Sequence, residues 1–301
     1  MTTPRVTVIT PCFNAGDTLA KALASLRAQT MANWECVVID DGSPTPICPI
    51  VEKIGDRRIR LVRFARNRGR SVARQKGLEM ARGRFICMLD ADDWYYPDKL
   101  AHQLAVIESR DDLAAVGMSL AVVDGNGELT GIRQFGQEAV EIRRNTRRRL
   151  PDIGFPPIML RRRQALRHRF DPRLRRAQDA DYLMRVLADQ NFAVMRRVGY
   201  AYHESWSPSA MRQALLALGY QRTIFVRDFR QAPLAMVEQY AGNLVKTGIY
   251  RAASAAGGGR WLFERRNRTP TRREERQFSV NHRVVARHLT DARSPARSQT
   301  S

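Results

Sequence analysis

The sequence of 301 residues predicts an α/β protein in which a mostly parallel sheet is flanked by helices. Two observations predict this fold. Strand and helix patterns alternate through the first hundred residues, and strands joined by helical connections pair in parallel through right-handed crossovers. Hydrophobic residues make up 44% of the chain and charged residues 27%, so a packed core is expected. The length suits one large α/β domain with an appendage, or two modest domains.

Each strand predicted in this part is a short apolar or β-branched run followed by turn residues. The helices between the strands carry apolar residues at helical spacing, and Asp17, Ser71 and Pro97 are typical of helix starts. We expect Pro11 to end the first strand. The predicted strands are Val6–Thr10, Trp34–Ile39, Ile59–Phe64 and Phe85–Leu89.

The middle of the chain changes character. Residues 114–123 and 128–132, joined by the turn Asp124-Gly125-Asn126-Gly127, predict a β-hairpin. Residues 143–176 hold 13 arginines but only two acids, and their prolines indicate an irregular stretch. The elements expected from there on are a strand at Ile158–Leu160, a helix near Arg162–Arg167, a helix at Asp179–Asp189 and a last strand at Phe192–Val198.

The C-terminal third is predicted to be helical. One helix is expected around Leu215 to Ile224 and another over Ala235–Tyr250, because apolar residues recur there at helical spacing. Gly257–Gly259 is typical of a hinge, and the last stretch, Asp291–Ser301, is expected to be disordered.

The net charge is +21, and 46 of the 51 basic residues are arginines. This is either a general compositional bias or an attraction to anionic partners: a diphosphate, a lipid phosphate or the negative leaflet of a membrane. Nucleic acid is a weaker candidate. Trp261 and the arginines around it could rest on an anionic membrane; the alternative is a helical segment packed on the main domain with its basic face in water.

The four cysteines form no CxxC pair and have no histidine cluster near them, so neither a zinc site nor a redox motif is expected. The N-terminus lacks a signal-peptide pattern, and no apolar run is long enough to span a membrane. We therefore expect reduced cysteines and a cytoplasmic protein, which could lie peripherally on the inner face of the plasma membrane.

Three carboxylates follow directly on the predicted strand Phe85–Leu89. Asp90, Asp92 and Asp93 repel one another unless a cation or hydrogen-bond donors compensate them. Mg²⁺ or Mn²⁺ would do so and would also bind phosphate oxygens. The alternative is a polar turn before a helix, with Asp93 as an exposed cap. The strand-end position favours metal binding, because ligands of parallel sheets bind outside the carboxyl ends of the strands.

Other polar residues have both a functional and a structural interpretation. Asp40 and Asp41 end the second strand, where a carboxylate can bind a nucleobase or ribose, although Asp-Gly-Ser is also ordinary turn chemistry. Arg74 suits an anion or is a surface arginine. Asp179 is a helix cap or a catalytic base. His203 is a packing residue or a ligand.

Taken together, these motifs resemble those of the family 2 glycosyltransferases with the GT-A fold. The segments that carry the resemblance are VTVITPCFNAGDTLAKALASLRAQT, CVVIDDGS and NRGRSVARQKGLEMARGRFICMLDADDWYYPDKL. A fainter similarity continues from PPIMLRRR to YAYHESWSPS, so that about residues 4–208 are covered. The resemblance implies a Rossmann-like sheet, with a helical C-terminal extension outside the family pattern.

The roles known for the family can be carried over onto matching positions. Asp179 matches the aspartate that is the general base of inverting members, although Gln178 replaces the glutamate that precedes it in many of them. Asp92 is the implied ligand of Mn²⁺ or Mg²⁺, with His203 as a further ligand or diphosphate contact. The implied nucleotide-sugar contacts are Thr10, Pro11, Asp40, Asp41, Arg74, Asp90 and Ala91.

The resemblance also divides the chain. Residues 1–110 are expected to form the half of the GT-A domain that binds the nucleotide-sugar, and residues 111–208 the half that binds the acceptor. Residues 209–256 would then be a helical extension, and residues 257–301 a basic C-terminal segment that is disordered in part.

The function implied by the resemblance is that of a metal-dependent inverting glycosyltransferase. It would move a sugar from a UDP-linked donor to a saccharide or lipid-linked acceptor, in surface polysaccharide or glycolipid synthesis. One alternative is a sugar nucleotidyltransferase, but residues 11–16 lack the basic residue that such enzymes carry near the first strand. The other is a non-enzymatic arginine-rich binder of nucleic acid or acidic lipid, which leaves the strand-end carboxylates unexplained.

Overall fold

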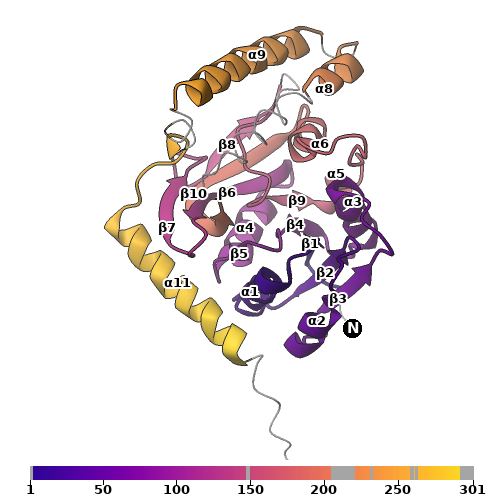
Figure 1. Ribbon diagram of the computed structural model, residues 1–301, viewed down its shortest axis with the longest axis vertical. Helices are drawn as coiled ribbons and strands as arrows, with labels where there is room; N and C mark the ends of the chain where they lie inside the picture. Colours follow the sequence, from indigo (N-terminus) through magenta and orange to yellow (C-terminus); the bar gives the residue numbers. More distant parts are fainter. Residues whose placement is uncertain are drawn as a thin grey trace, which may run out of the picture.

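The chain forms a ten-stranded sheet with helices on both faces, which confirms the α/β class that the sequence predicts (Figure 1). This computed structural model describes residues 3–146, 150–204, 221–230, 233–257, 261 and 264–291.

The N-terminal half of the sheet is parallel throughout. Its strands are β1 (Val6–Cys12), β2 (Trp34–Asp40), β3 (Ile59–Arg63) and β4 (Phe85–Met88). β1 lies between β2 and β4, and β3 pairs with the outer side of β2. The register places Cys12 opposite Asp40 and Ile9 opposite Met88. The carboxyl ends of β2, β1 and β4 therefore meet at one edge.

The second half of the sheet is mixed. Its strands are β5 (Trp94–Tyr95), β6 (Leu113–Val123), β7 (Leu129–Arg133), β8 (Glu141–Arg144), β9 (Met159–Arg161) and β10 (Asn191–His203). β9 joins the two halves by pairing antiparallel with both β4 and β6. β6 and β10 are parallel, whereas β7, β8 and β5 add antiparallel partners to them. The strand order is β3-β2-β1-β4-β9-β6-β10-β5.

Side chains alternate across the sheet, so each face has its own core. Val6 and Val8 pack with Leu23 in one core cluster, whereas Ile9 and Leu78 belong to another. The helices on the first face are α1 (Gly16–Arg27), α2 (Cys48–Ile54) and α4 (Lys99–Glu108). The helices on the second face are α3 (Arg70–Met80), α5 (Arg162–Ala165) and α6 (Gln178–Val186).

In the described ranges, three helices follow the sheet: α8 (Gln221–Asp228), α9 (Pro233–Ala255) and α11 (Arg272–Asp291). α11 lies along α1 (Figure 1). Its Phe278 and Val285 are buried, and the Phe278 ring lies 5.5 Å from that of Trp94. Part of the basic C-terminal segment is thus a helix packed on the sheet domain. The predicted disorder of Asp291–Ser301 and the expected helical residues 209–220 lie almost entirely outside the described ranges.

Several element boundaries differ from the sequence prediction. β1 continues through Pro11, which is paired with Ile39 of β2. Pairing with β4 ends at Ile9, so the nitrogen of Pro11, which has no N–H to donate, leaves no β4 residue without a donor. β10 runs past Val198 to His203, because an irregularity in its register with β6 lets the strand continue. The sequence did not predict α2, with a proline in its first turn, nor the short strands β5 and β8.

Candidate functional site

The carboxyl edge of the parallel half brings Asp40 and Asp92 to the same place. Cys12, the last residue of β1, lies opposite Asp40 in the sheet register. Burial, followed by the charges of Asp40 and Asp92, raises the pKa of the Cys12 thiol to about 11. The charges of both carboxylates therefore reach the Cys12 thiol and raise its pKa, although Asp40 and Asp92 are 52 residues apart in the sequence.

Arg74 is the centre of the charged part of this edge. It is 2% exposed, and its Nη2 donates to Asp90 Oδ1 at 3.0 Å. Burial alone would lower the pKa of Arg74, but the charges of Asp90 and then Asp179 raise it above its usual value. Its Nε and Nη1 are buried without a hydrogen-bond partner within the described part of the chain. Arg74 is therefore a buried cation whose guanidinium lies 4.7 Å from the centre of the Phe155 ring and whose Nε and Nη1 donate no hydrogen bond within the described residues.

Asp179 lies in the first turn of α6, next to a residue with an unusual backbone. Ala177 precedes the helix with a φ of 55°, in the left-handed region. Asp179 is half-buried, and its Oδ1 accepts from the N–H of Ala180 at 2.9 Å. The neighbouring Gln178 is buried. The Asp179 carboxylate in the first turn of α6 thus lies where its charge helps to raise the pKa of Arg74.

Asp93 is not an exposed cap. It is 1% exposed and accepts hydrogen bonds from Tyr200 Oη at 2.6 Å and from the His203 N–H at 2.7 Å. The N–H of Asp90 also donates to Tyr200 Oη, at 3.3 Å. These bonds fix the loop after β4 to the end of β10. The role of Asp93 and Tyr200 was missed from the sequence, because their partners are about 110 residues away.

Asp41 binds the backbone of its own domain. Its two carboxylate oxygens accept from the N–H groups of Arg68 at 2.7 Å and Gly69 at 2.9 Å. Gly42 must be a glycine, because its φ is +73° and a Cβ there would lie 2.4 Å from the backbone of Arg66. Asp41 thus holds the loop that leads into α3, on which Arg74 lies.

The remaining predicted nucleotide contacts lie around this edge. Asp40 is completely buried. Its Oδ1 accepts from the Ser43 N–H at 2.9 Å, and its Oδ2 is in an ion pair with Nε of Arg63 at 3.6 Å. Pro11 and Ala91 are buried at the ends of β1 and β4. Thr10 is also buried, with its hydroxyl 3.6 Å from Cys36 Sγ. The Thr10 side chain is therefore engaged inside the sheet rather than at its edge.

No cluster of three or more His, Cys, Asp or Glu side chains is arranged to hold a metal ion in the described part of the chain. Asp92 is an exposed residue. Protein atoms still partly exclude water from its carboxyl group, and this desolvation, followed by the charge of Asp90, raises its pKa. Nδ1 of His203 is buried and has no hydrogen-bond partner among the residues that the structure describes. Since Mg²⁺ at nucleotide sites often takes only one or two carboxylates and completes its shell with phosphate oxygens and water, these residues fit such an ion.

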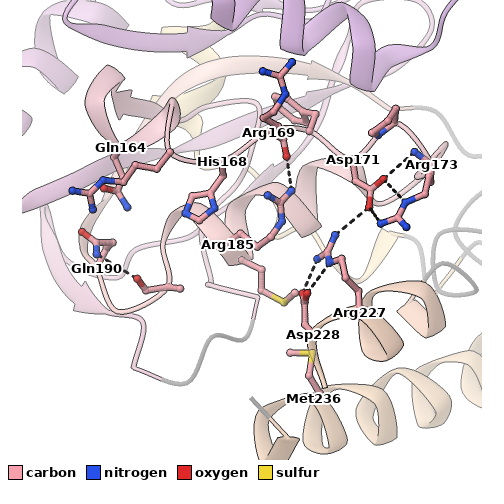
Figure 2. Close-up of a pocket in the computed structure, with 15 residues that line it drawn as sticks. Gln164, His168, Arg169, Asp171, Arg173, Arg185, Gln190, Arg227, Asp228 and Met236 are labelled. Carbon is pink, nitrogen blue, oxygen red and sulfur yellow. Dashed lines mark hydrogen bonds and ion pairs between the residues drawn. The ribbon is translucent and has the colours of Figure 1, made fainter. Parts of the chain in front are cut away.

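A cavity of about 820 Å³ lies elsewhere in the molecule (Figure 2). It is formed by residues 167–173, the second half of α6, and α8 with the start of α9. Arg227 of α8 donates to Asp171 at 3.2 Å and to Asp228 at 2.6 Å, and it also pairs with Asp181 (Figure 2 draws the first two). The lining includes none of the predicted site residues, all of which the structure describes, so the cavity and the carboxylate edge are separate places.

The chain belongs to Glycosyl transferase family 2, whose sequence profile matches residues 7–170. The succinoglycan biosynthesis protein ExoO of Rhizobium meliloti is 33% identical over 223 residues, which are 66% of this chain and 61% of ExoO. WfgD of Escherichia coli, a UDP-Glc:alpha-D-GlcNAc-diphosphoundecaprenol beta-1,3-glucosyltransferase, is 37% identical over 102 residues, 34% of this chain and 40% of WfgD. The chain thus spans less than two thirds of the length of these relatives.

Solved structures agree on the fold. TarS residues 1–349 of S. aureus, in complex with UDP-GlcNAc, superpose with a TM-score of 0.65 at 19% sequence identity, covering 95% of this chain and 81% of TarS. The chain therefore has the GT-A fold that the motifs imply, with helices beyond it.

Proposed function

We propose that this protein is an inverting glycosyltransferase that moves a sugar from a UDP-sugar to a saccharide or lipid-linked acceptor. The observation that carries the proposal is the buried cation Arg74. It is paired with Asp90, the charge of Asp179 also raises its pKa, and its Nε and Nη1 have no hydrogen-bond partner among the described residues. Such a cation beside a carboxylate suits a reaction in which a diphosphate leaves while a hydroxyl loses its proton.

In this proposal Asp179 is the general base. It takes the proton of the acceptor hydroxyl while that oxygen attacks the anomeric carbon, and the bond from that carbon to the diphosphate breaks. Arg74 stabilises the negative charge that builds up on the departing diphosphate. The edge residues Asp40, Asp41 and Pro11 surround the place proposed for the nucleoside. Membership of the family and the UDP-GlcNAc complex of TarS support a UDP-linked donor.

We propose that Asp92, with His203 as a further ligand, holds Mn²⁺ or Mg²⁺ together with phosphate oxygens of the donor. Carboxylate oxygens are the ligands that these ions prefer. A bound ion would neutralise charge on the leaving diphosphate. Asp93 and Tyr200 position both ligands, because they tie the loop that carries Asp92 to the strand end that carries His203.

The setting proposed for the reaction is the synthesis of surface polysaccharide or glycolipid at the cytoplasmic side of a membrane. The names of the relatives ExoO and WfgD support such an acceptor. All four cysteines of the chain are free, as expected in a reducing compartment.

The test compares donor binding with transfer. Calorimetry with UDP-sugars and Mn²⁺ measures binding, and release of UDP in the presence of lipid-linked and saccharide acceptors measures transfer. Asp179→Asn should keep donor binding and lose transfer by about 10²-fold or more. Asp92→Ala should lose the manganese-dependent part of binding. Asp111→Asn, at a carboxylate that is 90% exposed, is the matched control and should leave both unchanged.

Three results would contradict parts of the proposal. Equal loss of binding and transfer in Asp179→Asn would assign that residue to the fold rather than to catalysis. Near-normal turnover of Asp92→Ala would remove the metal role. Formation of a UDP-sugar from UTP and a sugar phosphate would favour the nucleotidyltransferase alternative instead.

A further inference from the structure

The long helix α9 turns an aliphatic face away from the protein. Its members are between 50% and 81% exposed, and their spacing of three, four and seven residues places them on one side of the helix. The residues of this α9 aliphatic face are Leu234, Val237, Leu244, Val245 and Ile249.

α9 is apolar on two sides. On the covered side, Met236 is buried and the Tyr240 ring lies 4.9 Å from that of Phe225 on α8. A surface helix ordinarily has polar residues away from its covered side, whereas on α9 the aliphatic face lies there and is open. In Figure 1, α9 lies at the outer edge of the molecule, beside α8. Contiguous exposed apolar surface of this kind marks an interaction site.

The surrounding sequence is strongly basic. Between residues 229 and 273 the chain has nine bases and two acids, and Trp261 in this stretch is 59% exposed. The bases are Arg230, Lys246, Arg251, Arg260, Arg265, Arg266, Arg268, Arg272 and Arg273, and the acids are Glu238 and Glu264. If a second copy of this chain covered the face, two such basic segments would lie together, and the repulsion between their like charges would oppose that contact. An anionic surface would attract them.

We propose that the α9 aliphatic face docks into the interface of a bilayer rich in anionic phospholipid. A helix that lies in the plane of the interface buries one apolar face at the boundary of headgroups and acyl chains, while its basic residues attract anionic lipids. This differs from a span: within the described ranges, the structure contains no helix that is both long and apolar enough to cross a membrane.

Vesicle co-sedimentation of the full chain tests the proposal without any nucleotide-sugar, so the result is independent of transfer activity. The chain should bind vesicles of phosphatidylglycerol and phosphatidylcholine more tightly than vesicles of phosphatidylcholine alone. The double variant Leu244→Gln, Ile249→Gln keeps the net charge and should lower the partition coefficient by about tenfold per side chain. Val280→Gln on α11, where Val280 is 49% exposed, is the matched control and should bind like the wild type.

A second variant tests the electrostatic part. Lys246→Gln with Arg251→Gln should reduce the preference for phosphatidylglycerol by about fivefold per charge, with little change on phosphatidylcholine. The proposal fails if the aliphatic double variant binds like the wild type. It also fails if that variant loses stability in urea without losing vesicle binding, since the chain itself would then cover the face. A dimer in sedimentation velocity that the double variant dissociates, with vesicle binding unaffected, would assign the face to a second copy.

Discussion

Replacing Asp171 with asparagine should lower the free energy of unfolding by about 2 kcal/mol at pH 7. Asp171 is 8% exposed. Its carboxylate accepts from Arg173 Nη2 at 2.8 Å and from Arg227 Nη1 at 3.2 Å. The hydrogen bonds from Arg173, more than the charge of Arg227, lower the pKa of Asp171 to about 2. The carboxylate joins the loop before α6 to α8, so this change weakens the attachment of the helical extension.

The sign of the pH dependence follows from the direction of the shift. A carboxyl group whose pKa is lower in the folded state stabilises that state above its unfolded pKa, which is about 3.9. That stabilisation is lost as the pH falls through the folded pKa. A shift to about 2 is worth about 2 kcal/mol at neutral pH, and about half of this remains at pH 3. The difference between the wild type and Asp171→Asn should therefore shrink steadily below about pH 5.

Urea denaturation followed by circular dichroism, at several values between pH 7 and pH 3, measures this difference. The control is Asp152→Asn, because Asp152 pairs with Arg143 at 2.8 Å but is 74% exposed. Its change should stay below about 0.5 kcal/mol at every pH. If Asp171→Asn loses as much stability at pH 3 as at pH 7, the depressed pKa is not the cause. If it loses none at pH 7, the ion pairs do not hold the loop.

Two substitutions and one chemical modification test other features of the fold. Gly77→Ala would place a Cβ 2.3 Å from Cγ2 of Ile9, so overpacking should lower the free energy of unfolding by about 1–3 kcal/mol, measured in urea. Asp41→Asn should cost a similar amount, about 1–3 kcal/mol, because one backbone N–H of the loop before α3 loses its carboxylate acceptor; an unchanged urea midpoint would contradict this. A thiol reagent at pH 8 should modify only Cys48 in the folded chain, since Cys48 is exposed while burial raises the pKa of thiols such as Cys12 to about 11; rapid reaction of more than one thiol per chain would refute it.

The parallel half of the fold was predictable because its signals are local. The first, second and fourth strands are apolar runs buried over their whole lengths, and turn residues follow them. β8 carries a different pattern: Glu141–Arg144 alternates between half-buried and exposed residues in an arginine-rich stretch. Such an edge strand owes its existence to pairing with β10, which no local pattern of four residues contains.

The sequence indicated candidate residues for the site, but the contacts that these residues make could not be predicted from it. The sequence indicated Arg74 and Asp90 as separate contacts of a nucleotide-sugar, while the ion pair between them depends on how α3 crosses the sheet. The burial of Asp93 was not predictable either. A carboxylate in a polar turn is normally solvated, and only the return of β10 beside the loop supplies Tyr200 and the backbone of His203 as donors.

The two N-terminal acidic clusters are Asp40 with Asp41, and Asp90 with Asp92 and Asp93, and one aspartate of each has a structural role. In each, one aspartate is committed to the fold: Asp41 to the N–H groups before α3, and Asp93 to the end of β10. The other member differs between the clusters: Oδ2 of Asp40 lies 3.6 Å from Nε of Arg63, whereas Asp92 is exposed and is the residue for which we propose metal binding. A single aspartate at a strand end could either hold the loop or bind a ligand. With two adjacent aspartates, one can hold the loop in place even when no ligand is bound to the other. Adjacent carboxylates at these strand ends therefore suit the preorganised site that we propose.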